Sequence, residues 1–76
     1  MMVTDEARAL ALVAAVGQTI KESGEEGAPE GPMYMALMQR GYSLEAFESI
    51  MRTLERVKLI RRSGHVAYWV GNGRTN

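Results

Sequence analysis

The stretch Ser43–Val70, SLEAFESIMRTLERVKLIRRSGHVAYWV, decides the fold of this chain. In its first half apolar residues recur at steps of three and four, at Leu44, Phe47, Ile50, Met51, Leu54 and Val57. A helix turns by about 100° per residue, so these side chains gather on one face, which must be buried. Ser43 can accept a hydrogen bond from the free amides of a first turn, so the helix is predicted to begin there.

The opposite face of this predicted helix is polar. It carries Glu45, Ser49, Arg52 and Arg56, with Glu48 and Thr53 on its flanks. We expect this face to meet solvent or a partner, because a single apolar stripe is enough to attach a surface helix to its core.

After the helix, residues 59–70 favour a β-hairpin. Apolar, β-branched and aromatic residues flank the polar segment 61–65, and Gly64 can take the positive φ of a tight turn. A loop of two residues and a loop of three both fit this pattern.

Alternation along the second strand separates its side chains into two sets. We expect Val66, Tyr68 and Val70 to face the core, and Ala67 and Trp69 to lie on the other face.

The segment upstream predicts two further helices. Residues 4–23 form the first, with Thr4 or Asp5 as its cap and Gly24 after its last turn. Its alanines permit close approach of a neighbouring helix, either in the core or across a dimer seam. A loop rich in glycine and proline follows, and the second helix covers about Met33–Arg40.

The composition predicts one domain over residues 1–76, ordered from about residue 4 to residue 70, with a flexible tail at 71–76. The absence of cysteine excludes disulfides, thiolate zinc sites and cysteine nucleophiles, and it favours a reducing compartment. The apolar run in the first helix is too short and too polar to span a bilayer. We therefore expect a cytoplasmic protein without a membrane partner.

The net charge of zero conceals an asymmetry along the chain. Residues 1–31 hold six acidic and two basic residues, whereas residues 32–76 hold seven basic and three acidic ones, so the two parts carry −4 and +4. One basic working face would produce this pattern, and so would two oppositely charged faces of a self-associating protein.

The short turn Gly41–Ser43 joins a brief helix to a longer amphipathic one, as in a helix-turn-helix. Over residues 4–70 the chain resembles the winged helix-turn-helix superfamily, carried by PMYMALMQRGYSLEAFESIMRTLERVKLIRRSGHVAYWV and by the order helix, helix, helix, strand, strand. The resemblance implies an α+β, mostly α fold, in which three helices precede a two-stranded antiparallel hairpin.

The resemblance also implies that the chain binds double-stranded DNA, with a role in regulating transcription. The third helix, about residues 43–57, would enter the major groove, and the hairpin would be a short wing. The implied groove contacts are Ser49, Arg52, Thr53 and Arg56, and the implied wing contacts are Arg61, Arg62 and His65.

These residues also have simpler explanations. Glu48 and Arg52 have the spacing of an exposed helical ion pair, and the arginines of the hairpin can keep a sheet edge soluble. In the alternative hypothesis the fold is a non-catalytic module for homodimerisation or for binding another protein, with Trp69 as the interface candidate. A further alternative packs this indole against the first helix.

Catalysis is not predicted. His65 is the only histidine, it lies in a predicted turn, and no nucleophile or metal ligand has a recognisable spacing from it. The glycines do not form a phosphate-binding loop. We therefore predict no enzyme activity, no cofactor, no metal and no small-molecule ligand.

Overall fold

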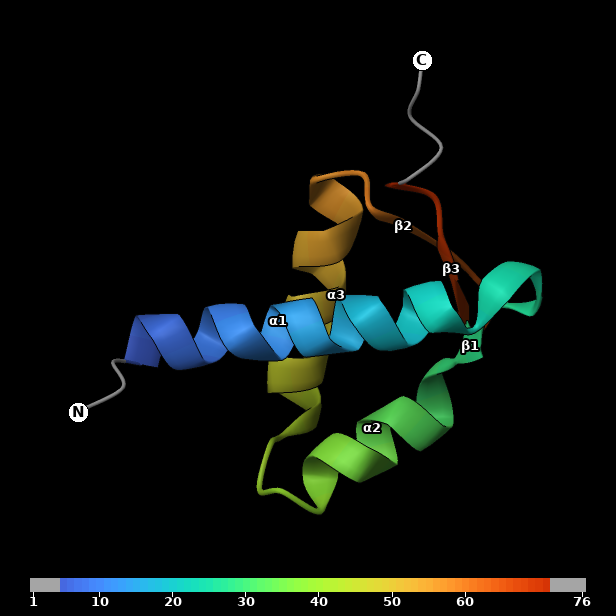
Figure 1. The fold of residues 1–76 in the computed structure, drawn as a ribbon. Coiled ribbons are helices and arrows are strands. Elements are labelled where there is room, and N and C mark those ends of the chain that lie inside the picture. The colour runs from blue at the N-terminus through green and yellow to red at the C-terminus, as the bar shows by residue number, and fades with distance from the viewer. Residues whose placement is uncertain (1–4, 72–76) are drawn as a thin grey trace.

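The computed structural model describes residues 5–71, which form three helices and one antiparallel sheet (Figure 1). The predicted α+β fold with a hairpin after the third helix is confirmed. In chain order the elements are α1 (Asp5–Glu22), the short 3-10 helix η1 (Gly24–Glu26), β1 (Ala28–Pro29), α2 (Glu30–Met38), α3 (Leu44–Arg56), β2 (Ile60–Ser63) and β3 (Val66–Trp69).

The sheet has three strands rather than the predicted two. β1 pairs with β3, which makes the strand order β1-β3-β2 and places the last strand of the chain in the middle. β1 holds only two residues, and two residues are too few to show alternation. Pro29 is tolerated because an edge strand can lack one amide donor.

The starts of α2 and α3 follow from the residues found there. Ser43 caps α3 as predicted, because its hydroxyl oxygen accepts a hydrogen bond from the Ala46 amide at 3.1 Å. α2 begins at Glu30 and not at Met33, so the predicted start is wrong. Pro32 therefore lies inside the first turn, where its missing amide hydrogen leaves no helical bond unmade.

The core lies where α1, α3 and β3 meet. Its largest fully buried side chains are Ile20 of α1 and Phe47, Met51 and Leu54 of α3. Figure 1 shows α1 crossing α3 at a steep angle, with the sheet beside the upper end of α3 and α2 below α1. The predicted buried face of α3 is confirmed at Phe47, Ile50, Met51 and Leu54. The prediction is wrong at Leu44 and Val57, which are exposed because the ends of the helix extend past the core.

The predicted core face of β3 is wrong. Ala67 is 0% exposed and Trp69 packs against the core, whereas Val66 and Tyr68 are half-buried on the outer face and Val70 is exposed. Alternation separates two faces but does not say which one meets the helices. The small side chain of Ala67 suits the close approach of β3 to the helices.

The hairpin turn has two residues, Gly64 and His65, because Ser63 pairs directly with Val66. Gly64 has φ +63°, which a residue without a Cβ atom adopts readily. The cap predicted at Thr4 lies outside the described residues, and so do residues 72–76 of the tail predicted at 71–76. Gly71, the first residue of that predicted tail, donates its amide to the Leu59 carbonyl at 3.0 Å.

Candidate nucleic-acid interface

The outer face of α3 comprises Glu45, Ser49, Arg52 and Arg56, all of which are exposed. α3 is attached to the domain by its opposite face, where Phe47, Ile50, Met51 and Leu54 are buried. Arg52 and Arg56 are one helical turn apart, so their guanidinium groups share this outer face. Among the described ion pairs neither arginine has a carboxylate partner.

Lys58, which the sequence analysis did not select, is exposed two residues after the end of α3. It is the only described residue other than glycine with a positive φ, at 65°. The Lys58 amide donates to the Glu55 carbonyl at 2.9 Å, and the Leu59 amide donates to the Leu54 carbonyl at 3.0 Å. This pair of bonds is a Schellman motif, in which glycine is the usual residue at the position of Lys58.

Ser49 and Thr53 lie toward α1. The Thr53 hydroxyl donates to the Ser49 carbonyl at 2.9 Å. Both residues line a hollow of about 350 Å³ between α1 and α3, together with Arg8 and Tyr42. Thr53 is therefore at the edge of the outer face and turned partly toward α1.

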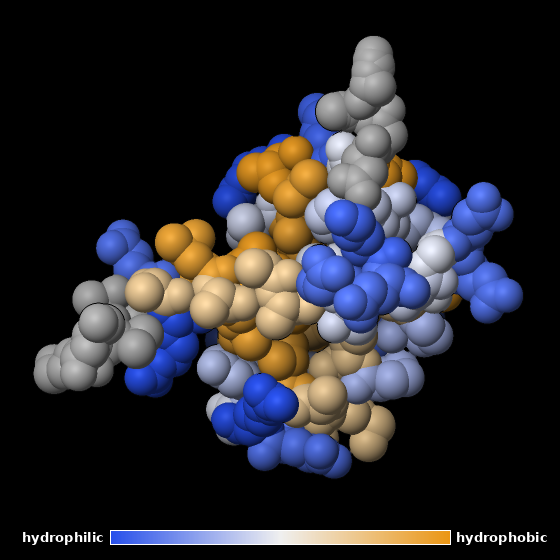
Figure 2. All heavy atoms as spheres, viewed as in Figure 1, coloured by the Kyte–Doolittle hydropathy of each residue, from blue (hydrophilic) through white to orange (hydrophobic). Residues whose placement is uncertain are grey.

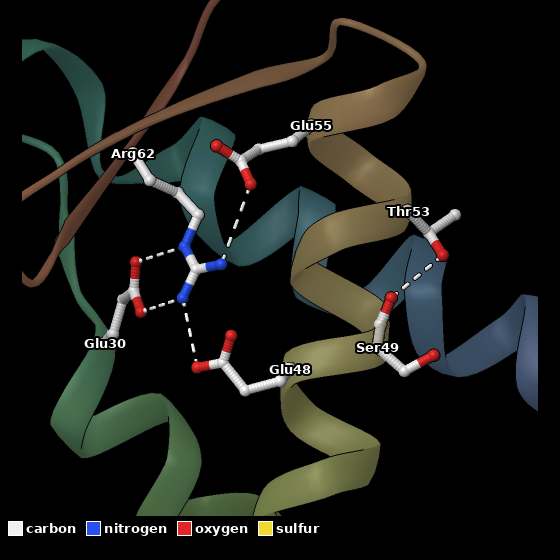
Figure 3. A network of polar contacts seen from close by, with 6 residues as sticks. All are labelled: Glu30, Glu48, Ser49, Thr53, Glu55 and Arg62. Carbon is white, nitrogen blue, oxygen red and sulfur yellow. Dashed lines mark hydrogen bonds and ion pairs between the residues drawn. The ribbon is translucent and has the colours of Figure 1, made fainter.

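Arg62 is not the free wing contact that was expected. Its Nε donates to Glu30 Oε2 at 2.8 Å, and its Nη2 donates to Glu30 Oε1 at 2.7 Å and to Glu48 Oε2 at 3.1 Å. Its Nη1 lies 3.7 Å from Glu55 Oε1. Figure 3 shows the guanidinium enclosed by the three carboxylates, on the side of α3 away from Ser49 and Thr53.

This network is an internal link. The Arg62 side chain is 19% exposed and that of Glu30 is 9% exposed. The hydrogen bond to Glu30, followed by that to Glu48, raises the pKa of Arg62 above its ordinary value. The expected pairing of Glu48 with Arg52 is also corrected, because Glu48 binds Arg62. Arg62 thus joins β2 to both α2 and α3.

Arg61 and His65 are exposed, but they lie apart from the outer face of α3. Arg61 is on the outer face of the sheet, where its guanidinium carbon lies 4.5 Å from the centroid of the Tyr68 ring. The His65 carbonyl accepts a hydrogen bond from the Glu30 amide at 2.8 Å. This bond ties the tip of the hairpin to the start of α2.

Trp69 packs inward against α1, which agrees with the alternative hypothesis that its indole packs against the first helix. A Cβ atom added to Gly17 would lie 3.4 Å from the Trp69 ring. The indole Nε1 is buried and has no acceptor among the described residues.

Three exposed cations on or just after α3 have no carboxylate partner among the described ion pairs: Arg52, Arg56 and Lys58. Within residues 5–71, no three histidine or acidic side chains are placed to hold a metal ion. In the same part of the chain no helix has the length and apolarity needed to cross a membrane.

Comparison of the chain with protein-family models, with curated proteins and with solved structures finds no match.

Proposed function

We propose that this chain is a winged helix-turn-helix domain that binds double-stranded DNA through the outer face of α3. The observation that carries the proposal is the pair of exposed arginines on this face, Arg52 and Arg56, on a helix whose opposite face is buried. The exposed Lys58 follows two residues after the end of this helix. Such a helix can lie against a duplex without losing its packing on the domain.

The element order supports this proposal. α2 and α3 are joined by a short turn in which Gly41 has φ +93°, and the hairpin of β2 and β3 follows α3 directly. The strand β1 between α1 and α2 completes a small sheet beside α3. A helix-turn-helix places its second helix in the major groove, which is the position proposed for α3.

The proposed contacts are of two kinds. Arg56 and Lys58, at the end of α3, pair with phosphates, which position the protein without reading sequence. Arg52 and Ser49 lie further along the outer face and reach base edges, where a guanidinium can bind guanine through two hydrogen bonds. Glu45 accepts from the cytosine amino group.

Arg62 has no part in this proposal, because its guanidinium is occupied by carboxylates. The hairpin contributes little, since its tip is bonded to α2. In this proposal the protein is a non-catalytic regulator of transcription. It acts in the cytoplasm, the location that its cysteine-free composition also favours.

Fluorescence anisotropy of a labelled duplex of mixed sequence tests the proposal. With two phosphate contacts, from Arg56 and Lys58, the logarithm of the binding constant should fall with the logarithm of salt concentration at a slope of about −2. Arg56→Ala and Lys58→Ala should each reduce this slope by about 1.

Arg61→Ala is the matched control. It removes the same charge from an exposed position on the outer face of the sheet, where the guanidinium lies over the Tyr68 ring. Its binding and slope should stay close to those of the unmodified protein. Absence of binding at low salt, or an equal loss in Arg61→Ala and Arg56→Ala, would overturn the proposal.

A further inference from the structure

The N-terminal half of α1 projects beyond the rest of the described chain. Residues 5–11 are all exposed, whereas Val16, Gly17 and Ile20 in the second half are buried. Figure 1 shows this half extending past α3 with no other element beside it. Short helices gain most of their stability from packing an apolar face, and residues 5–11 bury little of their surface against the described part of the chain.

Leu10 is the most prominent apolar side chain of this projection. It is 70% exposed, the largest fraction among the exposed large hydrophobic residues of the described chain. Figure 2 shows hydrophobic atoms on both sides of the N-terminal half of α1. An apolar surface of this kind indicates an interaction site.

A hollow of about 420 Å³ lies beside Leu10, along the same side of α1. Its lining includes Ala14 and Gly17 of α1, and Leu54, Leu59 and Trp69 from the end of α3 and the sheet. The walls are mainly apolar, and the absence of a side chain at Gly17 leaves the indole and the leucines at the bottom. The hollow could receive an aliphatic side chain of another molecule.

We propose that this face is a homodimer interface in which two copies of α1 pair in antiparallel orientation. A two-fold axis between Val13 and Ala14 places each Leu10 opposite Gly17 of the other copy. Each Leu10 then enters the hollow of its partner, and both hollows are filled by the same contact. Such self-complementarity is what an isologous interface requires.

The charges on α1 fit the same pairing. The two-fold axis that brings Leu10 to Gly17 also brings Glu6 to Lys21 of the other copy, twice in each dimer. Both residues are exposed, and neither forms an ion pair among the described contacts. A shift of the axis to Ala14 would instead place Leu10 opposite Gln18 and would no longer place Glu6 opposite Lys21. Opposite charges therefore favour the register that fills the hollow.

These features identify the occupant as a second copy of this chain. The inserted leucine, the hollow that receives it and both charges of the ion pair are all present on one face of one molecule. An unrelated partner would need to reproduce all of them.

Sedimentation equilibrium over concentrations from low micromolar to near millimolar tests the proposal. The mass should rise from one chain to two. Leu10→Asp should keep the helical circular dichroism, because the side chain is exposed, and should raise the dissociation constant at least about tenfold. Met35→Asp is the matched control, since Met35 is 54% exposed on α2 and should leave the mass unchanged.

The ion pair allows a test by charge exchange. Glu6→Lys alone and Lys21→Glu alone should each weaken the dimer, because each homodimer then contains two pairs of like charges. A mixture of the two variants should form a heterodimer, since both of its pairs are again of opposite sign. Failure of the mixture to associate more tightly than either variant alone would contradict the proposed register.

Trp69 provides a spectroscopic readout, because it is the only tryptophan and lines the hollow. Its emission should change with protein concentration in the native chain and not in Leu10→Asp. A native chain that remains a single molecule at all concentrations would overturn the proposal. None of these measurements uses DNA, so their outcome is separate from that of the DNA-binding test.

Discussion

Arg61 and Arg62 are neighbours on β2, yet their guanidinium groups have opposite surroundings. Successive side chains of a strand point to opposite faces, so one arginine lies over Tyr68 and the other lies among three carboxylates. Glu30 is 32 positions away from Arg62 in the chain. No local pattern connects two residues at such a distance, which is why the sequence suggested the same wing role for both arginines.

Replacing Arg62 should destabilise the fold. We expect Arg62→Met to lower the free energy of unfolding by about 3 kcal/mol, because it leaves the largely buried Glu30 carboxylate without its partner. Urea unfolding followed by circular dichroism measures this change. Arg61→Met is the matched control and should lose only about 0.5–1 kcal/mol, the value of an exposed contact between a cation and an aromatic ring.

A double-mutant cycle separates the ion pair from simple loss of packing. The variant with both Glu30→Leu and Arg62→Met should be more stable than Arg62→Met alone, since no unpaired carboxylate remains at position 30. If the effects of the two substitutions on the free energy of unfolding simply add, the ion pair between β2 and α2 contributes less to stability than its hydrogen bonds indicate.

At the scale of elements, α2 and α3 end in the same way. Each is followed by a residue with positive φ and then by an amide that donates to a carbonyl five residues earlier, but the residue with positive φ differs. After α2, Gly41 has φ +93° and the Tyr42 amide donates to the Leu37 carbonyl at 3.1 Å. After α3 the equivalent conformation is taken by Lys58. A side chain in the left-handed region costs about 1–2 kcal/mol. This cost makes Lys58 a candidate for function, because strained residues cluster at functional sites.

Two substitutions at Lys58 distinguish strain from function. Lys58→Gly should raise the free energy of unfolding by about 0.5–1 kcal/mol, because glycine adopts the positive φ readily. Lys58→Ala should leave the stability almost unchanged. Both should weaken DNA binding equally if the ammonium group contacts phosphate, and anisotropy measures that loss. A gain of stability without loss of binding would remove Lys58 from the proposed interface.

Gly27 is required by the contact between the loop before β1 and the sheet. Its φ of 80° and ψ of 171° are open to glycine almost alone, and an added Cβ atom would lie 2.6 Å from Val66 Cγ1. We expect Gly27→Ala to lower the free energy of unfolding by about 2–5 kcal/mol. Gly64→Ala should lose only about 1–2 kcal/mol, because it meets no neighbour and bears only the cost of its positive φ. Thermal unfolding compares them.

For the whole molecule, the sequence predicts what depends on local chemistry. The amphipathic period of α3 and the cap at Ser43 were correctly predicted, because both are written in consecutive residues. The strand β1 and the inward face of β3 were not, because they depend on residues brought together from distant parts of the chain. The exposed position of Arg52 and Arg56 followed from the period, whereas the enclosure of Arg62 required the tertiary structure.

A domain of this size has little stability to lose. Ile20 is 0% exposed and fixes α1 to the core. Ile20→Ala should therefore lower the free energy of unfolding by about 3 kcal/mol, a large part of a total on the order of 5 kcal/mol. Met35→Ala, at an exposed position, should change it by less than about 0.5 kcal/mol. The shift in melting temperature measures both.

The strand order β1-β3-β2 has a consequence for how the chain is made. β3 is the last of the described elements to leave the ribosome, and among the described strands it is the one that pairs with both of the others. Until β3 emerges, β1 and β2 have no strand with which to form hydrogen bonds, and the Arg62 side chain cannot link a formed sheet to α2 and α3. A nascent chain halted before Val66 would hold its helices without the sheet that covers them, and its apolar residues would be open to chaperones.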